Sequence, residues 1–260
     1  MELTSLASSS EGNSIFVGTK NTKVLVDCGI SAKRIENSLK ELGMKASQMD
    51  AILVTHEHSD HIKGLGVMAR RYGIPMFATS GTIDAMLSSG KIGEVSHDLF
   101  YGVEADRSFT LGDMIVNPTR ISHDAAEPVC YSFEADDVKA SIATDLGDYD
   151  DYIIEKLKDS NILFVEANHD VNMLQVGRYP YYLKQRILGS KGHLSNDRCA
   201  CLLNDVISDC TSHVYLGHLS KENNYAQLAY ETVKTELKMQ DISLEVAKRD
   251  QVSTLTNVIS

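Results

Sequence analysis

Hydrophobic and polar positions alternate along this chain in short runs that predict a sheet-rich protein. The runs are rich in β-branched and aromatic residues, and Gly, Asn or Asp bound most of them, as is typical of strands. The expected strands span residues 1–7, 14–18, 23–29, 51–56, 75–80, 108–119, 128–135, 139–145, 162–168 and 212–218.

Helices are expected between these strands. The segment 31–43 has Ser31 as its N-cap and ends before Gly43. The other expected helices span residues 60–72, 80–89, 149–159, 195–208 and 222–238. The first part of the chain is mainly strands in this prediction, and the second part alternates strand and helix. No repeat, linker or break in composition divides the chain, so we expect one α/β domain over residues 1–260.

Residues suited to chemistry stand where the predicted strands end. These residues are Asp27, His56, Asp145, Glu166 and His218. Strand ends and the loops that follow them are where α/β enzymes gather their sites. The pattern therefore predicts that these side chains share a functional site.

The segment THEHSDHIKG, residues 55–64, contains a dense cluster of side chains that can bind a metal ion. It places His56, His58, Asp60 and His61 directly after the apolar run AILV. In an extended segment, residues two apart point to the same side, so the first two histidines can face one ion. Ionisable side chains at the end of a buried strand are costly unless something neutralises them, and a metal ion would do so.

Charge is distributed unevenly along the chain. The formal net charge of -11 argues against broad nonspecific binding of nucleic acid, which requires a basic face. Two divalent ions would contribute about +4 at the site itself. The segment 178–198 is basic and rich in tyrosine, which makes it a candidate surface for a phosphate backbone and stacked bases. Its candidate substrate-binding residues are Arg178, Tyr181 and Lys191.

Cysteine usage and hydropathy bear on location. The 5 cysteines are odd in number and irregularly spaced, which is typical of reduced thiols in a cytoplasm. The first residues lack the features of a signal peptide, and no apolar stretch approaches the roughly 18 residues that a membrane span needs. We therefore expect a cytoplasmic protein with no membrane partner.

The run H-x-H-x-D-H at residues 56–61 resembles the motif of the metallo-β-lactamase superfamily. Asp27, His123, Asp145 and His218 follow the order of that superfamily's further site residues. Within the superfamily the chain resembles the YycJ/WalJ/VicX group, which is related to the tRNA 3′-processing nucleases. That likeness lies in the segments 8–14, 164–170, 192–195 and 217–220.

The resemblance implies a fold and a set of ligands. The implied fold is an αβ/βα four-layer sandwich with two metal ions at the strand ends. The first ion would be held by His56, His58 and His123, and the second by Asp60, His61 and His218. Asp145 would bridge both ions. Imidazole and carboxylate ligands suit zinc or manganese, and iron is also possible.

The resemblance also implies hydrolysis by a hydroxide that bridges the ions. Retention of His58 and Asp145 distinguishes the chain from the diiron redox branch and the class B β-lactamases. His193, in a glycine-rich loop, would protonate the leaving oxygen, and Glu166 would orient and charge its imidazole. Asp60, Glu166 and His193 are therefore the candidate catalytic residues.

The leading hypothesis is a dinuclear metal-dependent phosphodiesterase, most specifically a DNA exonuclease. Ser9, Asn13 and His169 join the substrate-binding candidates, the first two in a polar loop whose backbone N–H groups could bind a phosphate. One alternative is cleavage of RNA or of a small, for example cyclic, phosphodiester. An alternative of another class is a metal-binding accessory protein of a two-component signalling system.

Overall fold

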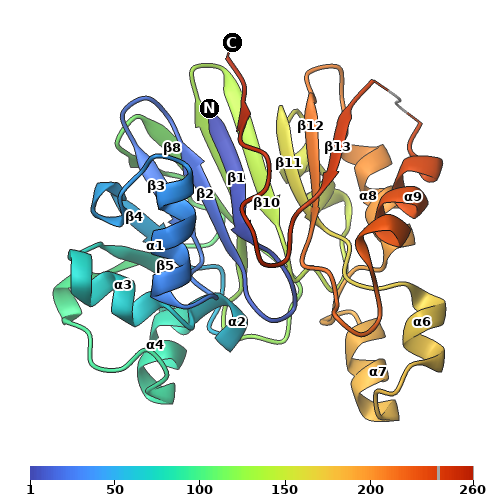
Figure 1. Cartoon of the computed structure of the whole chain (residues 1–260), viewed down its shortest axis with the longest axis horizontal. Coiled ribbons are helices and arrows are strands. Elements are labelled where there is room, and N and C mark those ends of the chain that lie inside the picture. Colours follow the sequence, from blue (N-terminus) through green and yellow to red (C-terminus); the bar gives the residue numbers. More distant parts are fainter. Residues whose placement is uncertain (239–240, 260) are drawn as a thin grey trace.

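The computed structural model describes residues 1–238 and 241–259, which form two seven-stranded sheets stacked face to face (Figure 1). The first sheet has the order β14-β1-β2-β3-β4-β5-β6, and the second has the order β13-β12-β11-β10-β9-β8-β7. The strands are β1 Glu2–Ala7, β2 Ser14–Gly18, β3 Lys23–Val26, β4 Ala51–Leu53, β5 Met76–Thr79, β6 Phe100–Val103, β7 Phe109–Leu111, β8 Met114–Arg120, β9 Val129–Ala135, β10 Val138–Ala143, β11 Ile162–Glu166, β12 His213–Gly217, β13 Ser243–Val246 and β14 Thr256–Asn257.

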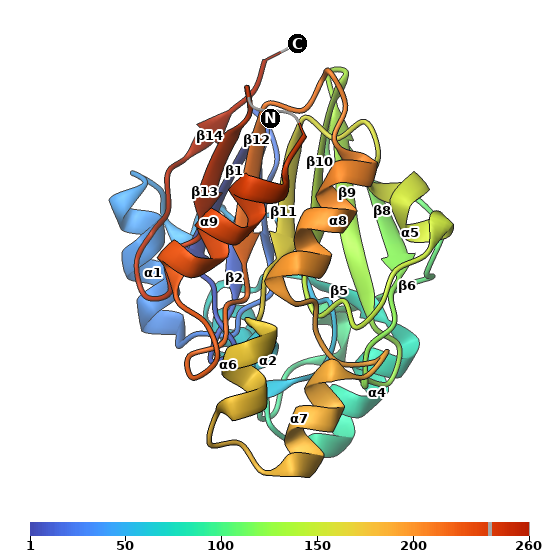
Figure 2. The ribbon, with the colours of Figure 1, turned by 90° about the vertical axis from the view of Figure 1, so that its right-hand side faces the viewer.

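Helices cover the outer face of each sheet. Helices α1 and α3 pack on the first sheet through an apolar cluster that includes Ile35, Leu39 and Met68. Helices α5, α8 and α9 pack on the second sheet, as Figure 2 shows. The expected αβ/βα four-layer sandwich is thereby confirmed. The helices are α1 Ala32–Glu41, α2 Ser59–Ile62, α3 Leu65–Tyr72, α4 Ser80–Ser89, α5 Asp151–Leu157, α6 Val171–Val176, α7 Tyr181–Leu188, α8 Asn196–Val206 and α9 Ala226–Glu236.

One apolar core joins the two sheets. Leu3 and Val17 of the first sheet share this core with Tyr131, Phe164 and Tyr215 of the second. All five side chains are buried, and the aromatic rings fill most of the space between the layers. Each sheet therefore lies between two apolar layers, which explains why its strands are apolar on both faces.

Parallel strands place the site residues at one edge of the sandwich. Strands β3, β4, β5 and β6 pair in parallel, and so do β10, β11, β12 and β13. The carboxyl ends of parallel strands meet at one edge of a sheet, and both sheets bring these ends to the same side of the molecule. The residues that follow β3, β4, β10, β11 and β12 thus converge.

Two expected elements are divided in the structure. The helix expected over residues 60–72 is two helices, α2 and α3, with Gly64 between them. Gly64 N donates to Cys28 O, and a Cβ on Gly64 would lie 2.3 Å from Ile30 O, so this backbone packs closely on residues 28–32. The strand expected over residues 108–119 is the hairpin β7–β8, which turns at Gly112 with a φ of 59°.

Five elements were not expected from the sequence: α6, α7, β6, β13 and β14. Helices α1 to α4 also alternate with the strands of the first half, so the expectation of a mainly stranded first part was wrong. Both halves of the chain build the same kind of half-sandwich.

The cysteines form no disulfides, as the sequence led us to expect. All five cysteines are free, and Cys201 and Cys210 are exposed. In the part of the chain that the structure describes, no helix combines the length and apolar character that a bilayer crossing requires.

Replacing Gly64 with Ala is expected to lower the free energy of unfolding by about 1–3 kcal/mol, because the added Cβ would overlap a backbone carbonyl that cannot move freely. Urea denaturation measures this change. Gly102→Ala is the matched control, because nothing lies within 4 Å of its added Cβ. Equal stability of the two variants would contradict the close packing at Gly64.

Candidate metal centre

At the edge that holds the cluster, three strands are followed by residues whose backbone is left-handed. Asp27 follows β3 with a φ of 61°, Asp145 follows the end of β10 with a φ of 58°, and His218 follows β12 with a φ of 56°. This conformation is uncommon for residues other than Gly and costs about 1 kcal/mol or more. It turns the chain sharply, and all three side chains are buried at the edge where the two sheets meet.

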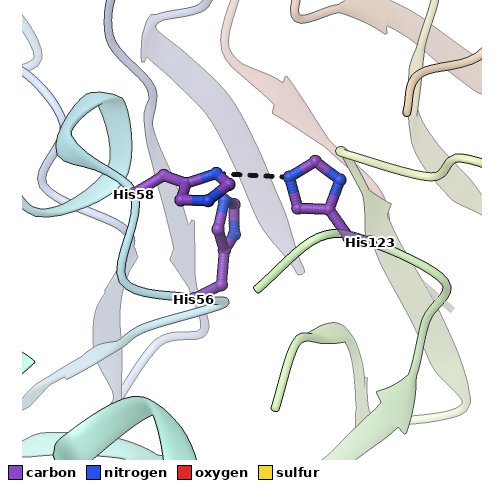
Figure 3. Close-up of side chains that lie close together, drawn as sticks. All are labelled: His56, His58 and His123. Carbon is purple, nitrogen blue, oxygen red and sulfur yellow. Dashed lines mark hydrogen bonds between the residues drawn. The ribbon is translucent and has the colours of Figure 1, made fainter. Parts of the chain in front are cut away.

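A first group of ligand atoms comes from three histidines. His56, His58 and His123 each place a ring nitrogen so that the three atoms lie within 4.8 Å of one another. His58 Nδ1 and His123 Nε2 are 3.3 Å apart, and Figure 3 shows the three rings converging from two chain segments. The expected first ligand set is thus assembled in space.

A second group lies beside the first. Asp60, His61 and His218 also bring ligand atoms within 4.8 Å of one another. Asp145 lies between the groups: its carboxylate is 3.1 Å from His61 Nε2, 3.3 Å from His218 Nε2 and 3.6 Å from His123 Nε2. All seven predicted ligand side chains therefore come together, and Asp145 is placed to reach both groups.

Hydrogen bonds to Nδ1 orient three of these histidines. His61 Nδ1 donates to Asp27 Oδ2 at 2.7 Å, and His123 Nδ1 donates to Gly192 O at 3.2 Å. His56 Nδ1 lies 3.0 Å from Thr55 Oγ1. Each contact leaves Nε2 to face the cluster, which is the arrangement that metal-binding histidines show in proteins.

Asp27 organises this layer around the ligands. One carboxylate oxygen accepts from Thr55 N at 2.9 Å, and the other accepts from both Thr55 Oγ1 and His61 Nδ1. The sequence placed Asp27 at the site, but the role of Thr55 was missed. A threonine beside a histidine motif does not by itself predict this role, because the contact depends on how β3 and β4 pair in the sheet.

The electrostatics of the cluster favour a bound cation. Burial would raise the pKa of Asp145, but His218 and His61 hold it well below its usual value. Burial would lower the pKa of His61, yet Asp145, Asp27 and Asp60 raise it well above its usual value. Carboxylates that favour a positive charge on the neighbouring imidazole so strongly also favour a bound metal cation. His56 Nε2 is buried and has no hydrogen-bond partner among the described residues, as expected of an atom that ligates a metal ion.

Glu166 and His193 form a pair at the edge of the cluster. His193 Nδ1 donates to Glu166 Oε1 at 2.7 Å, and Glu166 Oε2 accepts from Leu146 N at 2.8 Å. Burial alone would lower the pKa of His193, but Glu166 and Asp145 raise it to about 9. Glu166 is fully buried, so its carboxylate favours the cationic form of the imidazole.

His169 and Lys191 lie on cavities that border the site. His169 is buried in the wall of a cavity of about 580 Å³ that His193 also lines. Both of its ring nitrogens lack a partner among the described residues, and burial lowers its pKa to about 4. Lys191 is exposed and lines a cavity of about 790 Å³ together with His123 and Arg120.

The loop of Ser9 and Asn13 is built differently from the expectation. Ser9 N donates to Asn13 Oδ1 at 3.1 Å, Ser10 N to Leu219 O and Asn13 N to Asp60 O. Because these backbone N–H groups are used within the protein, the expectation that they bind a phosphate was wrong. The loop instead supports the cluster, since Ser8 Oγ accepts from His218 N at 2.8 Å.

Arg178 and Tyr181 lie further from the cluster, on the exposed α6–α7 hairpin. The sequence missed how this hairpin is tied to the site. Arg186 of α7 forms an ion pair with Asp124, which follows the candidate ligand His123. A charged pair of this kind, formed by residues far apart in the chain, is not visible in a sequence pattern.

The fold and the cluster together define an αβ/βα metallohydrolase-type domain, with imidazole and carboxylate ligands at the meeting edge of two sheets. Residues 22–219 match the family model described as "Beta-lactamase superfamily domain". The chain belongs to the metallo-β-lactamase superfamily.

Curated relatives match most of the chain. It is 44% identical over 224 residues to a Bacillus anthracis protein named exodeoxyribonuclease YycJ, covering 86% of this chain and 84% of that protein. It is 42% identical over 241 residues to exodeoxyribonuclease WalJ of Streptococcus pneumoniae (strain D39), covering 93% and 90%. Among solved structures, the metallo-β-lactamase fold protein YhfI of Bacillus subtilis has a TM-score of 0.73 at 14% identity, with 97% and 99% of the two chains covered.

Asp27→Asn is expected to weaken metal binding by about 10- to 100-fold, because it removes the anionic acceptor of His61 Nδ1 without changing the side chain's size. Competition with a chromogenic chelator measures the affinity. Asp50→Asn, which replaces an exposed acid directly before β4, is the control. Unchanged affinity in Asp27→Asn would show that Asp27 does not position His61.

Proposed function

We propose that residues 1–260 act as one hydrolase domain, a metal-dependent phosphodiesterase that degrades nucleic acid, with DNA preferred over RNA. The observation that carries this proposal is the seven-residue ligand cluster with the Glu166–His193 pair at its edge. The names of the two relatives, which match at 42–44% identity over most of their lengths, support an exodeoxyribonuclease. The free cysteines, two of them exposed, support a cytoplasmic location.

The residues fit two divalent ions, zinc or manganese, with iron also compatible. His56, His58 and His123 would hold one ion, and Asp60, His61 and His218 the other, with Asp145 shared. When bound, the ions would lower the pKa of water and stabilise negative charge on the phosphoryl oxygens.

His193 is proposed as the general acid. With Nδ1 held by Glu166, its Nε2–H can give a proton to the oxygen that leaves the phosphorus. Glu166 is itself fixed by a hydrogen bond from Leu146 N, and Leu146 follows Asp145. The position of His193 is thereby tied to that of the ligand cluster. Asp60, whose side chain is 22% exposed, would accept a hydrogen bond from the attacking water and orient it.

Further residues would contact or support the substrate. His169 stays neutral and offers one donor and one acceptor to a nucleotide in the cavity beside His193. Lys191, which lines the cavity of about 790 Å³, would bind a phosphate of the substrate. We assign Ser9 and Asn13 to supporting the cluster, because both are buried and bonded within their loop.

The proposal is tested by cleavage of end-labelled single-stranded DNA, double-stranded DNA and RNA, with manganese or zinc against chelator. We expect metal-dependent stepwise shortening, fastest on DNA, that is lost in Asp145→Ala and His58→Ala. Cleavage of a simple aryl phosphodiester alone would replace the polymer with a small substrate. Tightly bound metal without cleavage of any phosphodiester would instead favour the accessory role.

His193→Ala is expected to slow cleavage by about 10²- to 10⁴-fold while metal content stays unchanged, because a proton donor is lost and the ligands remain. Turnover and metal content are measured on the same preparation. His213→Ala is the control, because His213 begins β12 and His218 follows the opposite end of that strand. Full activity of His193→Ala would remove the general acid assignment.

A further inference from the structure

Helices α6 and α7 form a hairpin that projects beyond the strand ends beside the metal centre (Figures 1 and 2). Residues 171–196 carry four basic residues and no acidic one, in a chain whose net charge is -11. The tip of the hairpin is also apolar and exposed: Val176 is 87% exposed, Tyr181 76% and Tyr182 75%. Large aromatic side chains on a solvent face, together with local positive charge, indicate a binding surface.

One face of α7 forms a continuous stripe. Tyr181, Lys184, Gln185 and Leu188 recur at helical spacing and, with Gln175 of α6, line a shallow cavity of about 240 Å³. Lys184 Nζ donates to Gln175 O at 2.7 Å, which ties the two helices together. Because an ammonium group has three donors, the other two remain for an anion.

The stripe leads directly to the proposed general acid. Leu188 lines both this shallow cavity and the 580 Å³ cavity that contains His169 and His193. His193 N donates to Ile187 O at 3.0 Å, so the end of α7 is fixed against the site. Tyr181 lies roughly 10 Å from Leu188 along the helix, a length that about three stacked nucleotides span.

We propose that the α6–α7 hairpin is a stacking platform for an unpaired segment of the nucleic-acid substrate. Tyr181 and Tyr182 stack on bases, and Arg178 and Lys184 meet the backbone phosphates. This inference rests on the proposed function, since it names the form in which the polymer reaches that site. An unpaired strand fits better than a duplex, because the bases of a duplex are covered by their neighbours and cannot stack on side chains. An acidic protein partner would match the charge but would leave the tyrosines without π-stacked partners.

Binding can be measured without cleavage, by fluorescence anisotropy of a labelled 12-mer single strand on the full-length protein in chelator. The variant Tyr181→Ala/Tyr182→Ala is expected to bind at least about tenfold more weakly, because each lost stack costs about 1–3 kcal/mol. Tyr101→Ala is the matched control, since Tyr101 is also exposed but lies on the edge strand β6. Arg178→Gln and Lys184→Gln should each reduce the slope of log K against log salt by about 0.7.

A blunt duplex of the same sequence separates the alternatives. Its affinity should be the same for wild type and the double tyrosine variant. Unchanged affinity for the single strand, or an equal loss for strand and duplex, would overturn the platform. Because the substituted side chains are exposed, the variant should keep its fold, which circular dichroism and urea denaturation check against wild type.

The two proposals fail in different ways. If tyrosine-dependent binding is found but metal-loaded wild type cleaves no polymer, the platform stands and the nuclease function falls. If wild type cleaves DNA and the tyrosine variant matches it in both binding and cleavage, the nuclease function stands and the platform falls.

Discussion

The site depends on three non-glycine residues at strand ends whose backbone is held in a left-handed conformation. Asp27, Asp145 and His218 each adopt it, and each is fixed by hydrogen bonds from another segment. Thr55 N clamps Asp27, and Ser8 Oγ accepts from His218 N. Glu166 Oε2 accepts from the amide that follows Asp145. Without these clamps the chain would relax to an extended or right-handed turn, and the side chains would no longer converge.

These clamps also connect the two halves of the molecule. Ser8 belongs to the first half and His218 to the second, while Val129 N donates to Thr55 O and Tyr131 Oη donates to Val54 O across the sandwich. The sheets therefore meet through the apolar core and also through polar contacts just behind the ligands. Relative movement of the sheets would separate the two groups of candidate ligands. The geometry of the site therefore depends on the packing of the core.

How much the sequence could predict depends on how local each feature is. The candidate ligands in residues 56–61 and the α/β class follow from short-range patterns, and the resemblance supplied the order of the distant candidate ligands. The hydrogen bond of His123 to Gly192 and the Arg186–Asp124 pair depend on long-range packing, so no local pattern reveals them. Helices α6 and α7 were missed because each buries only one residue and therefore shows no apolar stripe. Strands β13 and β14 are short and partly exposed.

A chain with net charge -11 can still bind a polyanion, because charge acts locally in salt. At physiological ionic strength the Debye length is about 8 Å, so acids on distant faces are largely screened at the site. On the proposed function, a nucleic-acid strand near the candidate metal centre would meet the ligand cluster, with the cations that it would hold, and the segment 171–196, which has only basic charges. The acidic remainder then limits nonspecific adsorption along a duplex. On this proposal, the same sequence would combine general repulsion from nucleic acid with attraction confined to the candidate metal centre.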